Sequence, residues 1–481
     1  MRFSGRLSQT ARLGGRAEFV NDRHSALNRT SIARRIEPRR VHDVVRAVKQ
    51  ATDSGEPLAI AGARHAMGGQ QFLTGGTLLD MRMLNRVRRF DAEHGLIEAE
   101  AGITWPDLIR GYLVPQGSQE GWGIRQKQTG ADRLTLGGAV SANIHGRGLT
   151  ARPFVDDVES IELVTALGEV VTCSRTHRRE LFRNVVGGYG LFGVITAVTL
   201  RLVPRQKVER LVSVIEIDDL TAVLAERIAA GCLYGDFQFC TAPGNDAFLR
   251  TGVLSCYRPV DPSRPMPRNQ RRLSQDNWNR LLELAHTDKA QAFERFAGFY
   301  TSTNRQLYWS DTHQLNIYLE DYHGALDCRL GADAPGSEMI TELYVPRSRL
   351  VAFMDDVRRD FIEHGTNFIY GTIRLIERDT ETALPWASQS WACVIFNLHI
   401  DHRPEEISKG AGAFRRLIDH AIAHGGSYYL TYHRCARSDQ LMACHPRLPA
   451  QFRAKRAADP HGVFQSDWFR HTAALIGEPA T

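Results

Sequence analysis

The sequence predicts an α+β fold in two or three domains, and three observations lead to this prediction. The chain has 481 residues, more than one hydrophobic core usually holds. Helical and strand-like patterns alternate along it, but short hairpins interrupt the alternation, which is not typical of a doubly wound sheet. Glycine pairs and clusters gather before residue 200 and become sparse between 200 and 420. Tight backbone turns are therefore expected in the first part of the chain and ordinary side-chain packing in the middle.

The first 205 residues carry the signals of a small mixed domain. Apolar residues recur at helical spacing over 41–48 and predict a helix that a glycine ends. Thr104 is expected to cap a second helix, and Ser174 or Thr176 a third that ends at Val186. The expected strands are short and bounded by turn residues: 57–61, 77–81, the hairpins 87–90 with 96–101 and 161–165 with 169–172, and 194–202.

The middle of the chain predicts a second domain of mixed class. Its expected strands are 211–217, 340–345, 369–376 and 393–400, and its expected helices are 290–299, 348–364 and 404–424. The segment 263–312, rich in Arg, Asn and Gln, gives the weakest signal. We therefore divide the chain into a basic N-terminal tail (1–24), a first domain (25–205), a second domain (206–424) and a C-terminal segment (425–481).

Composition and charge exclude several classes of protein. The formal net charge is +6 with both signs interspersed, whereas a nucleic-acid-binding protein concentrates basic residues on one face. No apolar run is long enough for a membrane span. The eight cysteines form no Cys-x-x-Cys pair, so neither a metal site nor a disulfide framework is expected, and reduced thiols indicate a cytoplasmic location. The arginine-rich N-terminus lacks the apolar stretch of a secretory signal, and a basic tail is preferred over an organelle-targeting peptide.

The segment 188–193 reads Gly-Tyr-Gly-Leu-Phe-Gly, which matches the dinucleotide fingerprint in letters only. That fingerprint binds a pyrophosphate when it follows a strand and opens a helix. Here a predicted helix precedes the glycines and a predicted strand follows them, so a nicotinamide site is disfavoured. The glycines still indicate close backbone approach to another group.

Two more glycine-rich loops carry chemistry. Residues 136–148, with Thr129 and Gly130 before them, combine glycines with Ala and Ser, and such residues leave backbone N–H groups uncovered for a diphosphate. A packed glycine-rich turn is the alternative. In 61–69, small residues flank Arg64 and His65, which lets that pair approach a ligand, although a lone histidine is more often an ordinary satisfied polar residue.

In this order the three loops resemble the FAD-binding domain of the vanillyl-alcohol-oxidase superfamily, which is called the PCMH type. The similarity is greatest to the sugar-lactone and alditol oxidases and, more distantly, to the decaprenylphosphoryl-ribose oxidases. It covers about 35–204 and resumes at 459–467. The resemblance implies that FAD lies between two small α/β subdomains, that its ring faces a substrate (cap) domain with an antiparallel sheet, and that the C-terminal segment returns to the FAD domain.

The resemblance also implies the residues that contact FAD. They are Ala61, Gly62, Ala63, Arg64, His65, Ala66, Met67, Thr129, Gly130, Leu136, Gly137, Gly138, Ser141, Ala142, Asn143, Gly146, Gly190, Gly193, Val194 and Ile195. His65 stands where many relatives carry a histidine bonded covalently to the flavin. Their motif resembles Gly-x-Gly-His-Ser, from which Arg64 and Ala66 depart, so non-covalent contact stays the alternative.

Candidate catalytic residues lie on the expected strands of the second domain. Arg374 resembles a strand arginine of the alditol oxidases that holds substrate oxygens or balances flavin charge; a surface ion pair with Glu377 or Asp379 is the alternative. Asn397 and His399 alternate on one strand, so both are expected on one face, which meets either the site or solvent.

Four further candidates come from the resemblance. His433 is the first choice for the base that takes the hydroxyl proton, and Tyr432 stands where the ribose oxidases have lysine. His145 resembles a histidine that lies over the flavin edge, and Cys393 an active-site cysteine, although a buried core thiol is the commoner role.

The sequence therefore predicts an FAD-dependent oxidoreductase. The expected reaction oxidises the CH–OH group of a polyol, sugar or sugar lactone by hydride transfer to flavin N5, with O2, a quinone or a protein as electron acceptor. The alternatives are a C–C desaturase or reductase of the same superfamily and a flavin-binding subunit without turnover. Neither a metal nor a nucleic-acid partner is expected.

Overall fold

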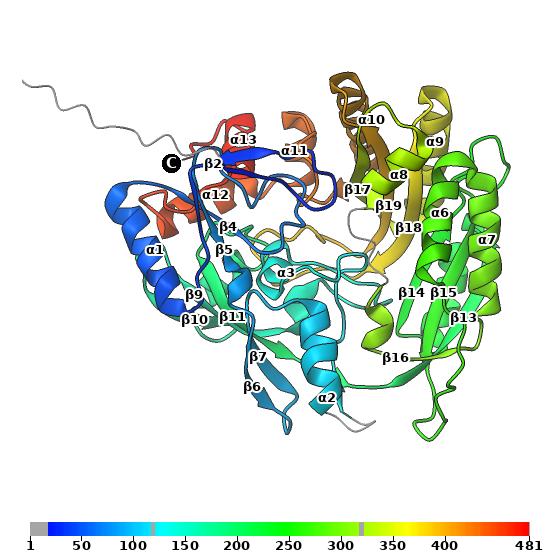
Figure 1. Cartoon of the computed structure of the whole chain (residues 1–481), viewed down its shortest axis with the longest axis horizontal. Helices are drawn as coiled ribbons and strands as arrows, with labels where there is room; N and C mark the ends of the chain where they lie inside the picture. Colours follow the sequence, from blue (N-terminus) through cyan, green and yellow to red (C-terminus); the bar gives the residue numbers. More distant parts are fainter. Residues whose placement is uncertain (1–17, 117–120, 317–321, 481) are drawn as a thin grey trace, which may run out of the picture.

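The computed structural model of the chain describes residues 18–116, 121–316 and 322–480 (Figure 1). Of the expected basic tail, 1–17 lie outside the described residues. The α+β class is confirmed, because sheets of several kinds are covered by helices and most strand pairs are antiparallel. In the described ranges, no helix combines the length and apolar character that crossing a bilayer requires.

A small parallel sheet begins the first part. Its order is β3 (Arg34–Ile36), β5 (Thr77–Asp80), β4 (Leu58–Ala61), and helix α1 (Val41–Ser54) connects its outer strands. The helix and the strands β4 and β5 were predicted and are confirmed, whereas β3 was not predicted. Two short strands, β1 (Glu18–Val20) and β2 (Thr30–Ile32), pair beside this sheet.

A five-stranded antiparallel sheet completes the first part. Its order is β10 (Val170–Ser174), β9 (Val158–Val164), β11 (Val194–Arg201), β7 (Leu96–Glu100), β6 (Val87–Asp91). Both predicted hairpins and the predicted last strand are confirmed. The helices on it are the π-helix η2 (Asp107–Leu113), α3 (Leu136–Ala142) and α4 (Arg179–Val185).

The predicted caps of these helices are wrong. Arg178 occupies the N-cap position of α4 in a left-handed conformation (φ +47°), and no side chain caps that helix. Ser174 Oγ instead accepts hydrogen bonds from the backbone N–H groups of Thr176 and His177 within the preceding turn. The Thr104 hydroxyl donates to Asp107 Oδ2 at 2.6 Å rather than accepting from the helix backbone.

The middle of the chain forms an eight-stranded antiparallel sheet. Its order is β16 (Leu307–Trp309), β13 (Lys207–Glu216), β15 (Thr251–Pro259), β14 (Tyr234–Phe239), β18 (Phe368–Ile376), β19 (Trp391–Asp401), β17 (Gly336–Pro346), β20 (Ser427–Tyr428). The predicted strands in β17, β18 and β19 are confirmed. The prediction missed β14 and β15, because both faces of these strands are largely buried and their sequences lack alternation.

Helices cover this sheet on both sides. In Figure 1, α6 (Gln275–Thr287) and α7 (Lys289–Ser302) lie side by side against β13–β15, and α10 (Pro404–Ala423) packs on β17 and β19. The remaining helices are α5 (Ile217–Ala229), α8 (Tyr322–Leu330) and α9 (Leu350–His364). The helices predicted over 290–299, 348–364 and 404–424 are confirmed, whereas α6 falls in the segment with the weakest sequence signal.

Strand register decides which side chains of this sheet face inward. On β19, Cys393 pairs with Arg374 of β18, and Asn397 pairs with Tyr370. On its other side, His399 pairs with Glu338 of β17. Paired residues point to the same face, and every second residue shares it. One face of β17–β19 therefore carries a set of polar side chains, and this face is directed toward the first part of the chain.

The C-terminal segment packs on the first part. Helices α12 (Leu448–Ala458) and α13 (Asp467–Leu475) lie near β2 and β4 in Figure 1, whereas α11 (Ser438–Cys444) packs on α10 and β20. The backbone N–H of Leu58 donates to the Val463 carbonyl at 2.7 Å, which extends the parallel sheet. A buried ion pair holds this turn, because Lys455 Nζ lies 2.8 Å from Asp459 Oδ2 and both side chains are 1% exposed.

We expect Asp459→Asn to lower the free energy of unfolding by about 3–5 kcal/mol, because it leaves the buried Lys455 without a counter-charge. Denaturant unfolding followed by circular dichroism measures the change. Lys409→Met breaks an exposed pair on α10 and serves as the control with little expected effect. An equal response of the two variants would contradict the structural role of the buried pair.

Candidate cofactor and substrate site

A cavity of about 580 Å³ lies between the glycine-rich loops and the inward face of the eight-stranded sheet. This volume falls within the range of natural small-molecule sites. Three separated segments of the first part line it, around 60–71, 128–144 and 189–195. The opposite wall comes from β17, β18 and β19 and from the segment around Tyr432.

Most of the residues predicted to contact FAD line this cavity. They are Ala61, Gly62, Ala63, Arg64, His65, Ala66, Met67, Thr129, Gly130, Gly137, Gly138, Ser141, Ala142, Gly190, Gly193 and Ile195. Four do not line it: Leu136, Asn143, Gly146 and Val194. The amide of Asn143 is occupied by protein groups, since its Nδ2 donates to Asp379 and its Oδ1 accepts from the Val155 backbone.

Close backbone contact explains two glycines of these loops. A Cβ atom on Gly62 would lie 2.1 Å from Thr135 Oγ1, at the N-cap of α3. A Cβ atom on Gly137 would lie 2.9 Å from Cβ of Ala101, whose carbonyl accepts the Gly137 N–H. Gly62 therefore lets the end of β4 approach the N-cap of α3, and Gly137 lets α3 approach the end of β7, so both glycines hold the loops at the cavity.

The glycine fingerprint at 188–193 has the reversed order that the sequence predicts, with α4 before it and β11 after it. Gly190 and Gly193 have φ angles of +79° and +146°, which side-chain-bearing residues rarely adopt. The Tyr189 N–H donates to the Ser141 carbonyl at 3.0 Å, so this loop is fixed to α3. The three loops therefore form one connected wall.

Arg374 is a buried cation on the opposite wall. It is 5% exposed, and its Nε and Nη1 have no hydrogen-bond partner among the residues that the structure describes. The ion-pair alternative from the sequence is wrong, because Glu377 binds Arg347 at 2.7 Å and Asp379 accepts from Thr382. A buried guanidinium without partners is costly, so its donors are available to a ligand in the cavity.

Tyr432 begins a chain of hydrogen bonds that runs from the cavity wall into the protein interior. Its hydroxyl donates to Glu342 Oε2 at 2.9 Å, and His145 Nε2 lies 2.7 Å from Glu342 Oε1. Glu342 also accepts from the Tyr344 hydroxyl and is fully buried. Burial alone would raise the pKa of Glu342, but His145 and the hydrogen bonds outweigh it and hold the pKa below its usual value. Burial, reinforced by Glu342, raises the pKa of Tyr432, so its hydroxyl stays protonated.

The chain is similar to known flavoproteins. Residues 32–174 match a family model described as an FAD binding domain. The chain is 33% identical to decaprenylphosphoryl-β-D-ribose oxidase of Mycolicibacterium smegmatis over 458 residues. The aligned region covers 90% of this chain and 93% of that enzyme. The chain belongs to the vanillyl-alcohol-oxidase superfamily. It is also 28% identical to cytokinin dehydrogenase 4 of Oryza sativa over 74% of this chain and 70% of that protein, and 31% identical to cytokinin dehydrogenase 1 of Arabidopsis thaliana over 35% and 30%.

The cavity fits the cofactor of this superfamily. Gly138 and Ser141, on the helix that Thr135 caps, present small side chains to the cavity, and the unpartnered Arg374 offers positive charge opposite them. The protein is therefore an FAD-linked oxidoreductase. Its architecture has two parts, and the second part is built on an antiparallel sheet.

Arg64 departs from the superfamily motif at a position where the backbone explains the usual glycine. Its φ is +63°, in the left-handed region, and its carbonyl accepts the Arg23 N–H at 2.9 Å. The next residue, His65, lines the cavity with Nδ1 2.9 Å from His24 Nε2. Burial, and then His24, hold the pKa of His65 well below its usual value, so its imidazole is neutral at pH 7.

The predicted catalytic residues separate into two groups. Arg374, Asn397 and Tyr432 line the cavity. The residues that do not line it are His145, Cys393, His399 and His433.

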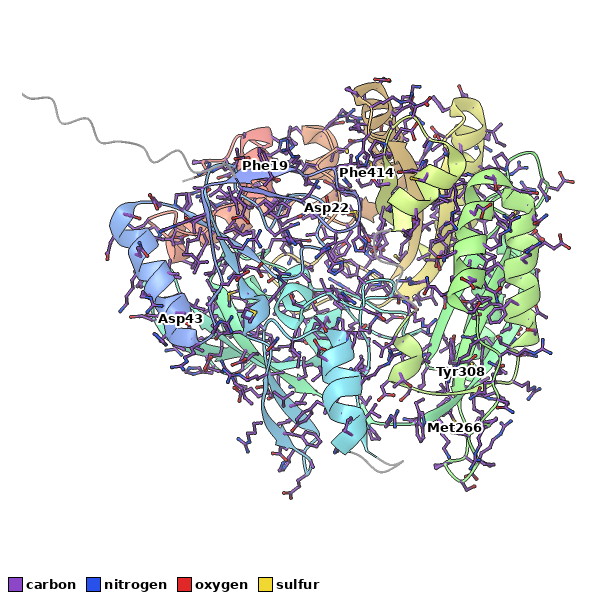
Figure 2. All side chains as sticks on the ribbon, viewed as in Figure 1. Phe19, Asp22, Asp43, Met266, Tyr308 and Phe414 are labelled. Carbon is purple, nitrogen blue, oxygen red and sulfur yellow. The ribbon has the colours of Figure 1, made fainter. Side chains whose placement is uncertain are left out.

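The four residues outside the cavity wall have other surroundings. Cys393 Sγ lies 4.0 Å from His145 Nε2, behind the wall, where burial raises the pKa of the thiol. His433 Nε2 lies 3.0 Å from Ser25 Oγ, and burial lowers the pKa of His433 to about 4. Ser25 Oγ donates to Asp22, which Figure 2 labels between the N-terminal strands and β17. His399 lies beside Glu338.

Sequence reasoning missed Glu342 and Arg147. Glu342 stands among apolar residues inside the predicted strand 340–345, where a buried carboxylate needs a partner, and this position was the available signal. Arg147 lies between two glycines of the second loop and lines the cavity. Its guanidinium lies 3.2 Å from Asp236 and 4.8 Å from the ring centre of Tyr257.

We expect Gly62→Ala to weaken FAD affinity by roughly tenfold or more, because steric overpacking costs about 1–3 kcal/mol and here separates β4 from α3. Flavin absorbance per protein after gel filtration, and titration of the apoprotein, measure the loss. Gly111→Ala is the matched control, since its Cβ meets nothing within 4 Å. Unchanged FAD affinity in Gly62→Ala would contradict the need for close contact between β4 and α3 at this glycine.

Proposed function

We propose that the protein oxidises the CH–OH group of a small polyhydroxylated substrate, such as a polyol, sugar or sugar lactone. The observation that carries the proposal is the chain Tyr432–Glu342–His145, which starts at the cavity wall and ends in the protein interior. Oxidation of an alcohol releases a hydroxyl proton, and this chain gives that proton a path. The similarity to an oxidase of a ribose derivative supports the same substrate class.

When bound, FAD supplies the two-electron acceptor for the hydride. The substrate hydroxyl donates to Tyr432 Oη, and the Tyr432 proton passes to Glu342 Oε2. A tyrosine that stays protonated transfers a proton in this way without first ionising. Glu342 is ionised, and His145 fixes its second oxygen.

Two polar residues of the opposite wall orient the substrate. Arg374 lines the cavity with a guanidinium whose Nε and Nη1 have no hydrogen-bond partner among the described residues, and Asn397 lines it on the neighbouring strand. An amide both donates and accepts, so the pair suits several hydroxyl or carbonyl oxygens. A C–C desaturase takes its proton from carbon and not from a hydroxyl group, and a subunit without turnover needs no proton path.

A substrate panel tests the proposal. Polyols, sugars and aldonolactones are mixed with the protein without oxygen, and loss of flavin absorbance is followed. At least one class is expected to reduce the flavin. No reduction by any of them, together with reduction by a compound that has only C–H bonds to lose, would replace the proposal by the desaturase. Peroxide formation on admission of oxygen then distinguishes oxygen from a quinone or protein as acceptor.

We expect Tyr432→Phe to lower kcat by about 10²- to 10⁴-fold while FAD content stays unchanged, because the proton path is interrupted. Stopped-flow reduction of the flavin by the active substrate measures the step. Tyr308→Phe removes a hydroxyl on edge strand β16 (labelled in Figure 2) from a residue that does not line the cavity, and is the control. Full activity of Tyr432→Phe would assign proton removal to another residue.

We also propose that His65 holds FAD covalently. The side chain lines the cavity, and the neutral imidazole is the protonation state that can act as a nucleophile. Acid-precipitated protein is then expected to stay yellow, and His65→Ala to release its flavin into the supernatant. His42→Ala, exposed on α1, is the control that keeps the colour in the pellet. Colour in the supernatant of the unaltered protein would show non-covalent binding.

A further inference from the structure

A second polar cluster lies on the same inward face of the eight-stranded sheet. His399 of β19 and Glu338 of β17 are paired in register, and His286 of α6 reaches them from the covering helix. His399 Nδ1 lies 3.6 Å from Glu338 Oε1, and His286 Nε2 lies 4.0 Å from the same oxygen. All three atoms lie within 4.8 Å of one another.

The three converging atoms are buried and unused. The side chains of His286 and Glu338 are 5% and 7% exposed, and that of His399 is 13% exposed. In the described part of the chain, His286 Nε2, His399 Nδ1 and Glu338 Oε1 have no hydrogen-bond partner. Both imidazoles lie within ion-pair distance of the carboxylate oxygen, but at 3.6 and 4.0 Å neither is close enough for a good hydrogen bond. Buried polar atoms are nearly always satisfied, so this loose group indicates a missing shared partner.

The geometry suits a small divalent transition-metal ion. Two imidazoles and one carboxylate are the protein ligands of many zinc sites with an open fourth position. Bonds of about 2.0–2.1 Å in a tetrahedral site separate ligand atoms by about 3.3–3.4 Å. The observed separations of 3.6 and 4.0 Å from Glu338 Oε1, and of no more than 4.8 Å between the two histidine nitrogens, exceed this, so side-chain rotations are needed to complete the site.

Outer contacts orient the ligands as they do in metal centres. The Tyr322 hydroxyl donates to the other carboxylate oxygen of Glu338 at 2.6 Å, and His323 Nε2 lies 2.8 Å from it. His399 Nε2 lies 3.5 Å from Asp401 Oδ1, a carboxylate–histidine arrangement that raises ligand basicity. A Cβ atom at Gly336 would lie 2.6 Å from His399 Cε1, so only glycine leaves room for this ring.

We propose that His286, Glu338 and His399 bind one divalent transition-metal ion, of which Zn²⁺ is the best match. The ion joins α6 to β17 and β19. Because Glu338, Tyr322 and His323 line the cavity, the ion also fixes the part of the cavity wall that they form. The flavin chemistry is not needed for this binding, so the site stands independently of the proposed reaction.

Metal content of the full FAD-loaded protein tests the site. Protein purified without added chelator is expected to hold about one first-row metal ion per chain by elemental mass spectrometry. After chelator treatment, added Zn²⁺ is expected to restore one equivalent and to raise Tm. Cobalt(II) in place of zinc is expected to give the visible absorption of a low-coordinate histidine–carboxylate site.

Variants locate the ion. His399→Gln and Glu338→Gln are expected to weaken Zn²⁺ binding by more than about 100-fold, because loss of an outer contact alone costs about 10- to 100-fold. Tyr322→Phe is expected to fall in that smaller range. His402→Gln is the matched control: this histidine is three residues from His399, bonds Ser337 and lies outside the cluster.

Circular dichroism and FAD content identify any variant that fails to fold, and the Zn²⁺ titration of the unaltered protein then decides. The proposal is overturned by unaltered protein that takes up no tightly bound Zn²⁺. It is equally overturned by folded His399→Gln protein that binds Zn²⁺ as tightly as His402→Gln protein does.

Discussion

Two carboxylates buried on one strand, Glu338 and Glu342, constrain the arrangement of the whole cavity wall. Both point inward from β17, and neither can stay ionised in the interior without compensation. Glu342 is compensated by His145 from the first part of the chain and by Tyr432 from the C-terminal segment. Binding one charge thus joins three distant parts of the sequence at the site. The sheet supplies the anion, and the other parts supply its partners.

The cavity wall formed by the glycine-rich loops is built mainly from small residues and not from charged ones. Gly62 and Gly137 are there because Thr135 and Ala101 approach them closely, and Gly190 and Gly193 because the chain turns sharply. These constraints are local and leave a clear trace in the sequence. For this reason most residues predicted for the FAD loops line the cavity, Arg64 among them, although Leu136, Asn143, Gly146 and Val194 do not.

The inward face of the sheet was predictable only in part. Strand alternation placed Asn397 and His399 on one face, and the structure shows this, but it did not tell which of them reaches the cavity. The adjacent Tyr432 and His433 point to different surroundings, because the chain there is irregular and has no period to read. His145 and Glu342 are 197 residues apart, and no local pattern connects them. The absence of a metal site was inferred from the cysteines, whereas the histidine–carboxylate cluster is assembled from three separate elements.

The spacing of Glu338 and Glu342 explains how one strand can serve two purposes. Residues four apart on a strand share a face and lie about 13 Å apart. An ion held by Glu338 is therefore too far away to touch the atoms that Tyr432 touches, so it stabilises the wall without joining the proton path. Its charge still acts over that distance. A dication at about 13 Å and an effective dielectric constant of about 20 stabilises a carboxylate by about 2–3 kcal/mol. The ion and His145 thus act in the same direction, and both favour the ionised form of Glu342 that accepts the proton.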